Sequence, residues 1–344
     1  MRAARIALAL AALCTTAVPA RVGADALRDQ AKQLFGTPPA EAVNPANPSS
    51  PAKIDLGRKL YYDARLSKNH DVSCNSCHQL DKFGVDNEPT SPGHKGQRGG
   101  RNSPTSLNAA FHLAQFWDGR AADVEEQAKG PILNPVEMAM PDEASVVAVL
   151  LSIPGYPPLF AQAFPGDGPA VTYDNMAKAI ASFERRLVTP APFDQYLAGD
   201  DGALSKDQKK GLETFIATGC PTCHNGPLLG GSLYQRLGLV EPYPTDDRGR
   251  AEVTGSKSDE YFFKVPSLRN IAKTGPWLHD GSVDSLDLMV RVMARFQLGK
   301  TLTDDEAQAI NDFLQSLTGK VDEKYVAQPE LPPSGPDTPP PDPS

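Results

Sequence analysis

Apolar residues recur at intervals of three and four in several separate stretches of the 344-residue chain. This spacing places them on one side of a helix, and it is clearest in residues 26–34, 143–152 and 174–187. Strict alternation of apolar and polar residues, which is typical of strands, is rare. The pattern therefore predicts a mainly α fold.

Two helix starts carry a capping box, in which Ser or Thr is followed three residues later by Gln or Glu. Ser205 with Gln208 opens a helix that runs into a cysteine motif. Thr303 with Glu306 opens another, which we expect to end at Gly319.

Three segments lack an apolar side. Residues 84–103 contain one large apolar residue, Val85, and several glycines, so we expect them to bury little surface and to be mobile. Residues 189–202 resemble a linker. Residues 328–344 hold eight prolines and no aromatic residue, which predicts a disordered or polyproline tail.

Residues 1–24 have the features of a signal peptide. Two arginines precede a short apolar run, and small residues mark cleavage points after Ala20 or Ala24. The run is too short to cross a bilayer, and no other segment is long and apolar enough. We therefore expect an exported, soluble protein of a bacterial periplasm without an integral membrane segment.

The chain is acidic. Loss of residues 1–24 would remove three arginines and no acid, which changes the formal charge from −8 to −8 − 3 = −11. Negative charge opposes binding to nucleic acid and speeds the encounter with a basic protein. We therefore exclude nucleic acid as a partner.

The cysteines indicate the chemistry. Apart from Cys14, all lie in two copies of Cys-x-x-Cys-His: Cys74, Cys77 and His78, then Cys220, Cys223 and His224. This is the attachment signature of c-type haem, in which two thiols bond to the haem and the histidine ligates its iron. Zinc or dithiol redox sites use similar spacings but do not require the histidine in both copies. The sequence predicts two covalently bound haem c groups.

An internal repeat accompanies the two motifs. Residues 103–120 align with residues 265–282 at an offset of 162, and the haem motifs are 146 residues apart. We therefore expect two cytochrome c-like haem domains related by internal duplication, with long loops. Their predicted extents are residues 25–195 and 196–327, followed by the tail.

Each haem needs a ligand on its other side. Met289 and Met293 lie one helical turn apart after the second motif, and either is a candidate, although lone methionines usually pack in cores. His94 lies in the glycine-rich loop after the first motif, where a displaceable ligand is reasonable.

The chain resembles the bacterial dihaem cytochrome c peroxidases over nearly all of residues 50–320. The matching strings are VSCNSCH, RNSPTSLNAAF, QFWDGR, QAKGPILNPVEM, ASFERRLVTPAPFDQYL, GCPTCHNG, PSLRNIAKTGPWLHDGS and VMARFQLG. The resemblance implies that hydrogen peroxide is reduced at the haem on His78, with His94 as its sixth ligand in the oxidised form. It implies that electrons enter at the haem on His224, with Met293 as the other ligand.

The resemblance also assigns roles to other residues. Glu137 and Gln127 match the distal catalytic pair, and Trp117 matches the tryptophan between the haems. Asn102, Thr274 and Pro276 match residues around an interdomain calcium. His279 is a candidate contact of a haem propionate, and His70 and His112 are expected to have no catalytic role.

The electron donor implied by the resemblance is a monohaem cytochrome c or a small copper protein, and related proteins are often homodimers. Three alternatives remain at this stage. They are a dihaem electron carrier without catalysis, a peroxide or redox sensor, and the relative that matures methylamine dehydrogenase. That relative has a tyrosine in the position of Met293.

Overall fold

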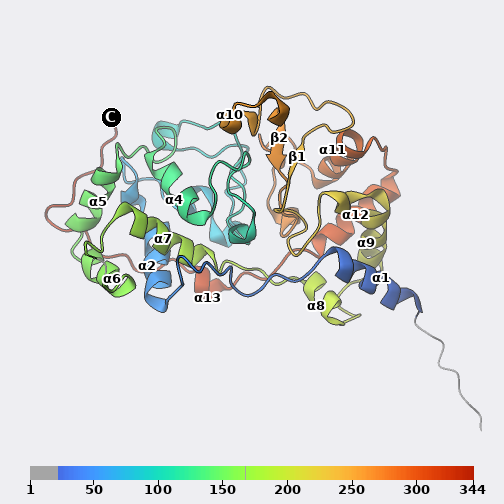
Figure 1. Ribbon diagram of the computed structural model, residues 1–344, viewed down its shortest axis with the longest axis horizontal. Coiled ribbons are helices and arrows are strands. Elements are labelled where there is room, and N and C mark those ends of the chain that lie inside the picture. The colour runs from blue at the N-terminus through green and yellow to red at the C-terminus, as the bar shows by residue number, and fades with distance from the viewer. Residues whose placement is uncertain (1–21, 167) are drawn as a thin grey trace, which may run out of the picture.

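The computed structural model describes residues 22–166 and 168–344. Two helical units lie side by side in it (Figure 1). The predicted signal peptide falls almost wholly outside the described residues. The mainly helical prediction is confirmed, since the described strands form one two-stranded antiparallel sheet.

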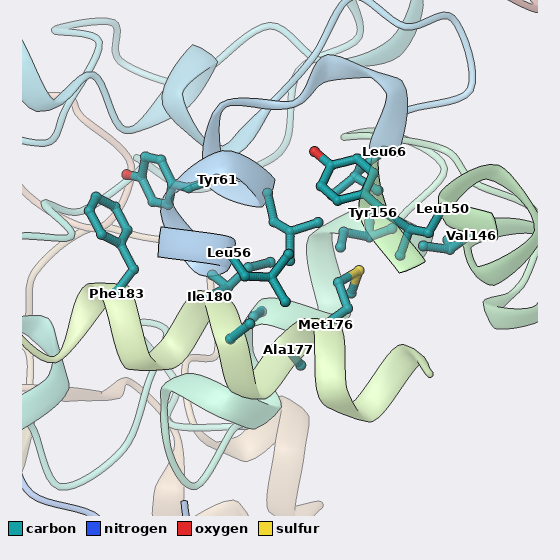
Figure 2. Packing of buried hydrophobic residues seen from close by; sticks show 14 of the residues in the cluster. Leu56, Tyr61, Leu66, Val146, Leu150, Tyr156, Met176, Ala177, Ile180 and Phe183 are labelled. Carbon is teal, nitrogen blue, oxygen red and sulfur yellow. The ribbon is translucent and has the colours of Figure 1, made fainter. Parts of the chain in front are cut away.

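The first unit is built from five longer helices: α2 (Pro51–Tyr62), α4 (Val124–Leu133), α5 (Glu143–Ser152), α6 (Tyr156–Ala163) and α7 (Tyr173–Glu184). Its core forms where Leu56 and Tyr61 of α2 face Ile180 and Phe183 of α7 (Figure 2). Each such fully buried side chain contributes about 1.5–3 kcal/mol. This packing fixes α2, which leads into the first haem motif.

The second unit contains α9 (Lys206–Thr218), α11 (Leu286–Leu298), α12 (Asp304–Gln315) and the hairpin of β1 (Tyr234–Arg236) and β2 (Phe262–Lys264). Both predicted capping boxes form. Ser205 Oγ accepts from Gln208 N at 3.1 Å, and Thr303 Oγ1 accepts from Glu306 N at 3.2 Å. The helix α9 ends at Gly219 in a left-handed conformation, directly before Cys220.

Short helices complete the chain. They are α3 (Cys74–Cys77), α10 (Ala251–Thr254) and α13 (Glu323–Val326), with 3₁₀ turns at Ala64–Leu66, Leu80–Lys82, His94–Gly96, Ala109–Phe111, Cys220–Thr222, Lys257–Asp259 and Ile271–Lys273. Around the two cysteine motifs, the chain is therefore mostly irregular, with only short helices and turns.

The helix predictions differ from the structure mainly at carboxyl ends. The expected helix 143–152 matches α5, whereas α7 ends at Glu184 and α12 at Gln315, before Gly319. Gly319 has another role, because a Cβ there would lie 2.3 Å from the carbonyl oxygen of Thr189. The close approach of two backbones requires glycine at this position.

The predicted linker 189–202 contains a helix, α8 (Pro192–Ala198). Its Phe193, Tyr196 and Leu197 are buried in the second core. The helix α1 (Val22–Leu34) joins the same core through Leu27 and Ala31, and Phe35 directly after the helix also belongs to it. The second core therefore draws on residues that the predicted domain boundaries assign to the first domain.

The proline-rich tail, for which the sequence predicts disorder or a polyproline conformation, is an extended segment that packs on the first unit. After α13, it runs back along the first unit, and the carboxyl end lies beside α5 (Figure 1). Thr338 Oγ1 donates to Ser152 O at 3.2 Å, and Ser334 Oγ accepts from Arg65 at 3.0 Å. Proline limits the entropy lost on docking, and the exposed carbonyls of an extended segment can accept hydrogen bonds from the surface.

No single described helix is long and apolar enough to cross a membrane; α5 and α6 reach that length and apolarity only as a pair, across a bend of 109°.

Candidate functional site

The first cysteine motif forms one turn of helix, α3. His78 N donates to Cys74 O at 2.9 Å, so the histidine closes the helical turn that carries the two thiols. Tyr61 of the adjacent α2 donates its hydroxyl to His78 O at 2.8 Å. The imidazole Nδ1 is buried and has no hydrogen-bond partner among the described residues. Burial lowers the pKa of His78, which favours the neutral form that ligates metal.

The second motif opens a large cavity lined mainly by apolar side chains. Cys220, Cys223 and His224 line it. His224 Nδ1 lies 3.0 Å from Leu229 O and donates to it, so Nε2 carries the lone pair that can bind a metal. This is the orientation that a histidine ligand of a metal usually has. The four described cysteines are free thiols, and together with the two histidines they fit two haem c groups.

His94 is buried, although its loop is glycine-rich. His94 N donates to Glu137 O at 2.7 Å, and a Cβ on Gly93 would lie 2.1 Å from Val136 O. The loop is therefore closely packed at His94, and it is open at Gly99 and Gly100, where a Cβ would meet nothing within 4 Å. The predicted mobility of residues 84–103 stays a prediction.

Glu137 lies in the turn after α4, and Gln127 lies on α4 itself. Asn134 Nδ2 donates to Glu137 Oε1 at 2.9 Å. Burial raises the pKa of Glu137, and the charge of Arg120 opposes that rise. Arg120 is a residue that the sequence analysis passed over. Its guanidinium lies over the ring of Phe116 and binds Asp118, and only the folded chain brings it toward Glu137.

Trp117 comes from the first unit but lines the cavity of the second motif. Its Nε1 donates to Asn102 O at 2.9 Å, and its carbonyl accepts from Lys264 N at 2.7 Å. These hydrogen bonds tie Trp117 to both units, and its role between the haems stays a prediction.

Both methionine candidates line the same cavity. Met289 and Met293 lie on α11 and pack against a small cluster that includes Leu237 and Phe263. The structure brings both to the second motif and does not choose between them, so the assignment of Met293 stays a prediction.

The three predicted calcium residues also gather at this cavity. Asn102, Thr274 and Pro276 all line it. Asn102 N donates to His279 O at 2.7 Å, which joins the loop of the first unit to the second. The calcium itself stays a prediction.

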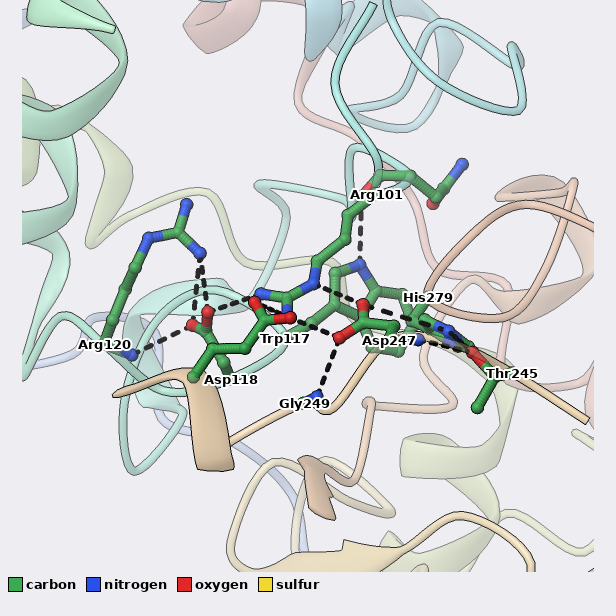
Figure 3. A network of polar contacts seen from close by, with 10 residues as sticks. Arg101, Trp117, Asp118, Arg120, Thr245, Asp247, Gly249 and His279 are labelled. Atoms are coloured by element: carbon green, nitrogen blue, oxygen red, sulfur yellow. Dashed lines mark hydrogen bonds and ion pairs between the residues drawn. The ribbon is translucent and has the colours of Figure 1, made fainter. Parts of the chain in front are cut away.

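A polar network joins the units beside this point (Figure 3). Arg101 of the first unit binds both carboxylate oxygens of Asp247 at 2.7 Å and also binds Asp118. His279 lies 3.9 Å from Asp247 and 3.1 Å from Thr245 Oγ1. Sequence reasoning missed Arg101 and Asp247, because their separation of 146 residues leaves no local pattern.

The two repeat segments share backbone features at the same offset. Asn108 and Asn270 both have left-handed φ angles, 62° and 61°, and each precedes a 3₁₀ turn. The isolated bridges Gln115–Ala121 and Trp277–Val283 follow in equivalent places.

A family model described as di-haem cytochrome c peroxidase matches residues 51–202. The chain is 49% identical to the cytochrome c551 peroxidase of Pseudomonas aeruginosa, over 92% of each chain. It is 46% identical to the cytochrome c551 peroxidase of Nitrosomonas europaea, over 88% of this chain and 90% of that one. The methylamine utilization protein MauG of Methylophilus methylotrophus is 34% identical, over 84% and 89%.

Solved structures agree on the fold. A MauG-like protein associated with microbial copper homeostasis superposes with a TM-score of 0.74 at 27% identity, over 85% of this chain and 95% of that one. The dihaem peroxidase BthA of Burkholderia thailandensis gives 0.68 at 20% identity, over 87% and 97%. The relatives match over most of this chain, and the chain carries the two haem motifs. The chain therefore belongs to the dihaem cytochrome c peroxidase family.

Proposed function

We propose that the protein reduces hydrogen peroxide to water at the first motif, with electrons that a small redox protein delivers at the second. One observation carries the division of labour. A backbone hydrogen bond links His94 to Glu137, and the charge of Glu137 acts on Cys77 of the first motif. By contrast, no Asp or Glu of the described chain lines the cavity of the second motif. Peroxide cleavage needs a group that moves protons, and electron transfer does not.

Haem supplies the iron that binds peroxide and exchanges electrons. Glu137 would take the proton from the inner peroxide oxygen and return it to the outer one, so that the leaving oxygen departs as water. Burial raises the pKa of Glu137, which makes its carboxylate a better proton acceptor than an exposed one. Gln127 would hold the peroxide by a hydrogen bond.

His94 would occupy the remaining site at the first motif in the resting protein and leave it for peroxide. The open glycines at 99 and 100 provide the freedom for that movement. At the second motif, Met293 would complete the ligand pair, and Trp117 would lie on the electron path between the units. Calcium at Asn102, Thr274 and Pro276 would hold the two units in register.

Further parts of the proposal rest on the family. They are export to the periplasm, a monohaem cytochrome c or copper protein as donor, a homodimer, and an origin of the two units by duplication. The shared backbone features of residues 108–121 and 270–283 support the duplication. Met293 argues against the activity that matures methylamine dehydrogenase.

The test measures oxidation of a reduced monohaem cytochrome c by hydrogen peroxide, with calcium present. Enzyme as isolated and enzyme pre-reduced by one electron are compared. Turnover that requires pre-reduction supports both the peroxidase and the His94 gate, and equal turnover removes the gate.

The variant Glu137→Gln, with both haems confirmed, is expected to lower turnover by about 10²-fold or more. Absence of turnover in the unmodified protein with several donors would favour an electron carrier or a sensor.

A further inference from the structure

Lys264 is a buried cation without an anionic partner among the described residues. It lies on β2, and 6% of its surface is exposed. Its Nζ donates to Ala114 O at 2.9 Å and lies 3.1 Å from His112 Nδ1. Both of these partners are uncharged, because burial and the charge of Lys264 lower the pKa of His112 far below its ordinary value.

Such an arrangement is costly by itself. A buried ammonium loses several kcal/mol of hydration unless an opposite charge compensates it. Burial lowers the pKa of Lys264 to about 7, and the charge that opposes this fall is that of Asp118, which already binds Arg101 and Arg120. The protein alone therefore provides Lys264 with too little negative charge.

His112 positions the ammonium group of Lys264. Its Nδ1 accepts from Lys264, so the neutral ring carries its proton on Nε2. That Nε2 is buried and has no hydrogen-bond partner among the described residues. A Cβ on Gly231 would lie 2.5 Å from the ring of His112, so this face of the imidazole is tightly confined.

Both side chains line the cavity of the second motif, together with Cys223 and His224. Within the described chain, Lys264 is the one Lys, Arg, Asp or Glu in that lining. Haem, the group expected in the cavity, carries two carboxylates, and this mainly apolar lining offers them a single ammonium, that of Lys264.

We propose that Lys264, positioned by His112, binds a propionate carboxylate of the haem attached at Cys220 and Cys223. The inference deepens the proposed function, on which it rests for the presence of that haem. Because His112 belongs to the first unit and Lys264 to the second, both units would contribute to the propionate site beside Trp117. The contact would neutralise the lysine and stabilise the reduced haem relative to a haem with an unpaired propionate.

The test compares Lys264→Met and His112→Phe with Lys264→Arg, which keeps the charge. Lys300→Met is the matched control, since Lys300 also donates to a carbonyl of the second unit, Thr218 O at 2.8 Å, but does not line the cavity. The readouts are the propionate bending bands in resonance Raman spectra and the midpoint potential of the second haem.

Lys264→Met is expected to shift a propionate band and lower the midpoint potential, and His112→Phe to shift the same band. Lys264→Arg should restore the band toward the unmodified position, and Lys300→Met should leave it in place. Unchanged propionate bands in both Lys264→Met and His112→Phe would overturn the proposal, even if the potential moved, because any nearby cation affects the potential.

Haem content measured by the pyridine haemochrome shows whether each variant is loaded. If Lys264→Met does not mature, His112→Phe and Lys264→Arg still give the band comparison. These spectra need no peroxide, so a protein that binds the propionate but lacks turnover would contradict the proposed function alone.

Discussion

Thr189 shows how one side chain can join both halves of the chain. Its hydroxyl accepts from Asn108 Nδ2 at 2.8 Å and from Asn270 Nδ2 at 2.9 Å. The two asparagines occupy equivalent places in the repeat segments, and all three side chains are buried. Composition reveals none of this, because the acceptor lies in the segment that reads as a linker.

Thr189→Val is expected to lower the free energy of unfolding by about 2–4 kcal/mol, since two buried amide donors lose their acceptor. Thr189→Ser keeps the hydroxyl and should lose about 1 kcal/mol for the missing methyl group. Chemical denaturation of the haem-loaded protein measures both. Similar losses for the two variants would show that the methyl group matters and the shared hydroxyl does not.

Glu184 predicts a pH dependence of stability. It is buried on α7, and burial, together with the charge of Glu125, raises its pKa to about 8. Between the ordinary value near 4.5 and about 8, the folded protein holds a proton that the unfolded chain releases. Stability from this group is therefore full at low pH and is lost as the pH rises through that window.

Glu184→Gln removes the titration while keeping the shape. Relative to the unmodified protein, its stability should rise between pH 5 and pH 8 by an amount on the order of a few kcal/mol. Glu213→Gln, on the exposed side of α9, is the control. Parallel stability curves for Glu184→Gln and the unmodified protein would contradict the prediction.

At the scale of elements, each unit has one pair of closely packed helices. A Cβ on Gly57 of α2 would lie 1.9 Å from Ala179 O of α7, and a Cβ on Gly211 of α9 would lie 1.9 Å from Ala309 O of α12. Each of these glycines lies on the helix that leads into a haem motif. The helix pattern was predictable from the sequence, but the need for glycine was not, because it arises from the partner helix.

Gly57→Ala and Gly211→Ala are each expected to cost about 1–3 kcal/mol, because the added methyl forces the backbones apart. That loss exceeds the gain of up to about 1 kcal/mol from better helix propensity. Gly99→Ala, where the added Cβ meets nothing, should change stability by less than about 0.5 kcal/mol. Thermal unfolding of the three variants measures these changes in stability. A higher melting temperature for Gly57→Ala would contradict the close packing of α2 on α7.

At the scale of the whole molecule, each unit receives a terminal segment of the other. The helix α1 packs in the second core, and α13 and the tail pack on the first unit. At its end, the tail reaches the candidate ligand: Ser344 O lies 3.2 Å from His94 Nε2 and accepts from Lys68 Nζ at 2.9 Å. Separation of the units would therefore expose apolar and polar surface on both.

Truncation after Ala327 removes these tail contacts. Amide hydrogen exchange should speed up in residues 65–68, 93–97 and 152–155, which the tail covers or supports. Exchange in α9 and α12, which the tail does not touch, is the internal control. Unchanged exchange around His94 would mean that the tail is not a support of that loop.

By itself, the sequence determined the covalent chemistry, the capped helices and the acidic charge, because each depends on residues a few positions apart. It also placed Cys74, Cys220 and their histidines without ambiguity. Only the tertiary structure decided that α8 is a helix, that the tail docks, and that Lys264 meets His112. Those contacts join residues separated by many tens of positions, and the path of the folded chain, not any local pattern, brings them together.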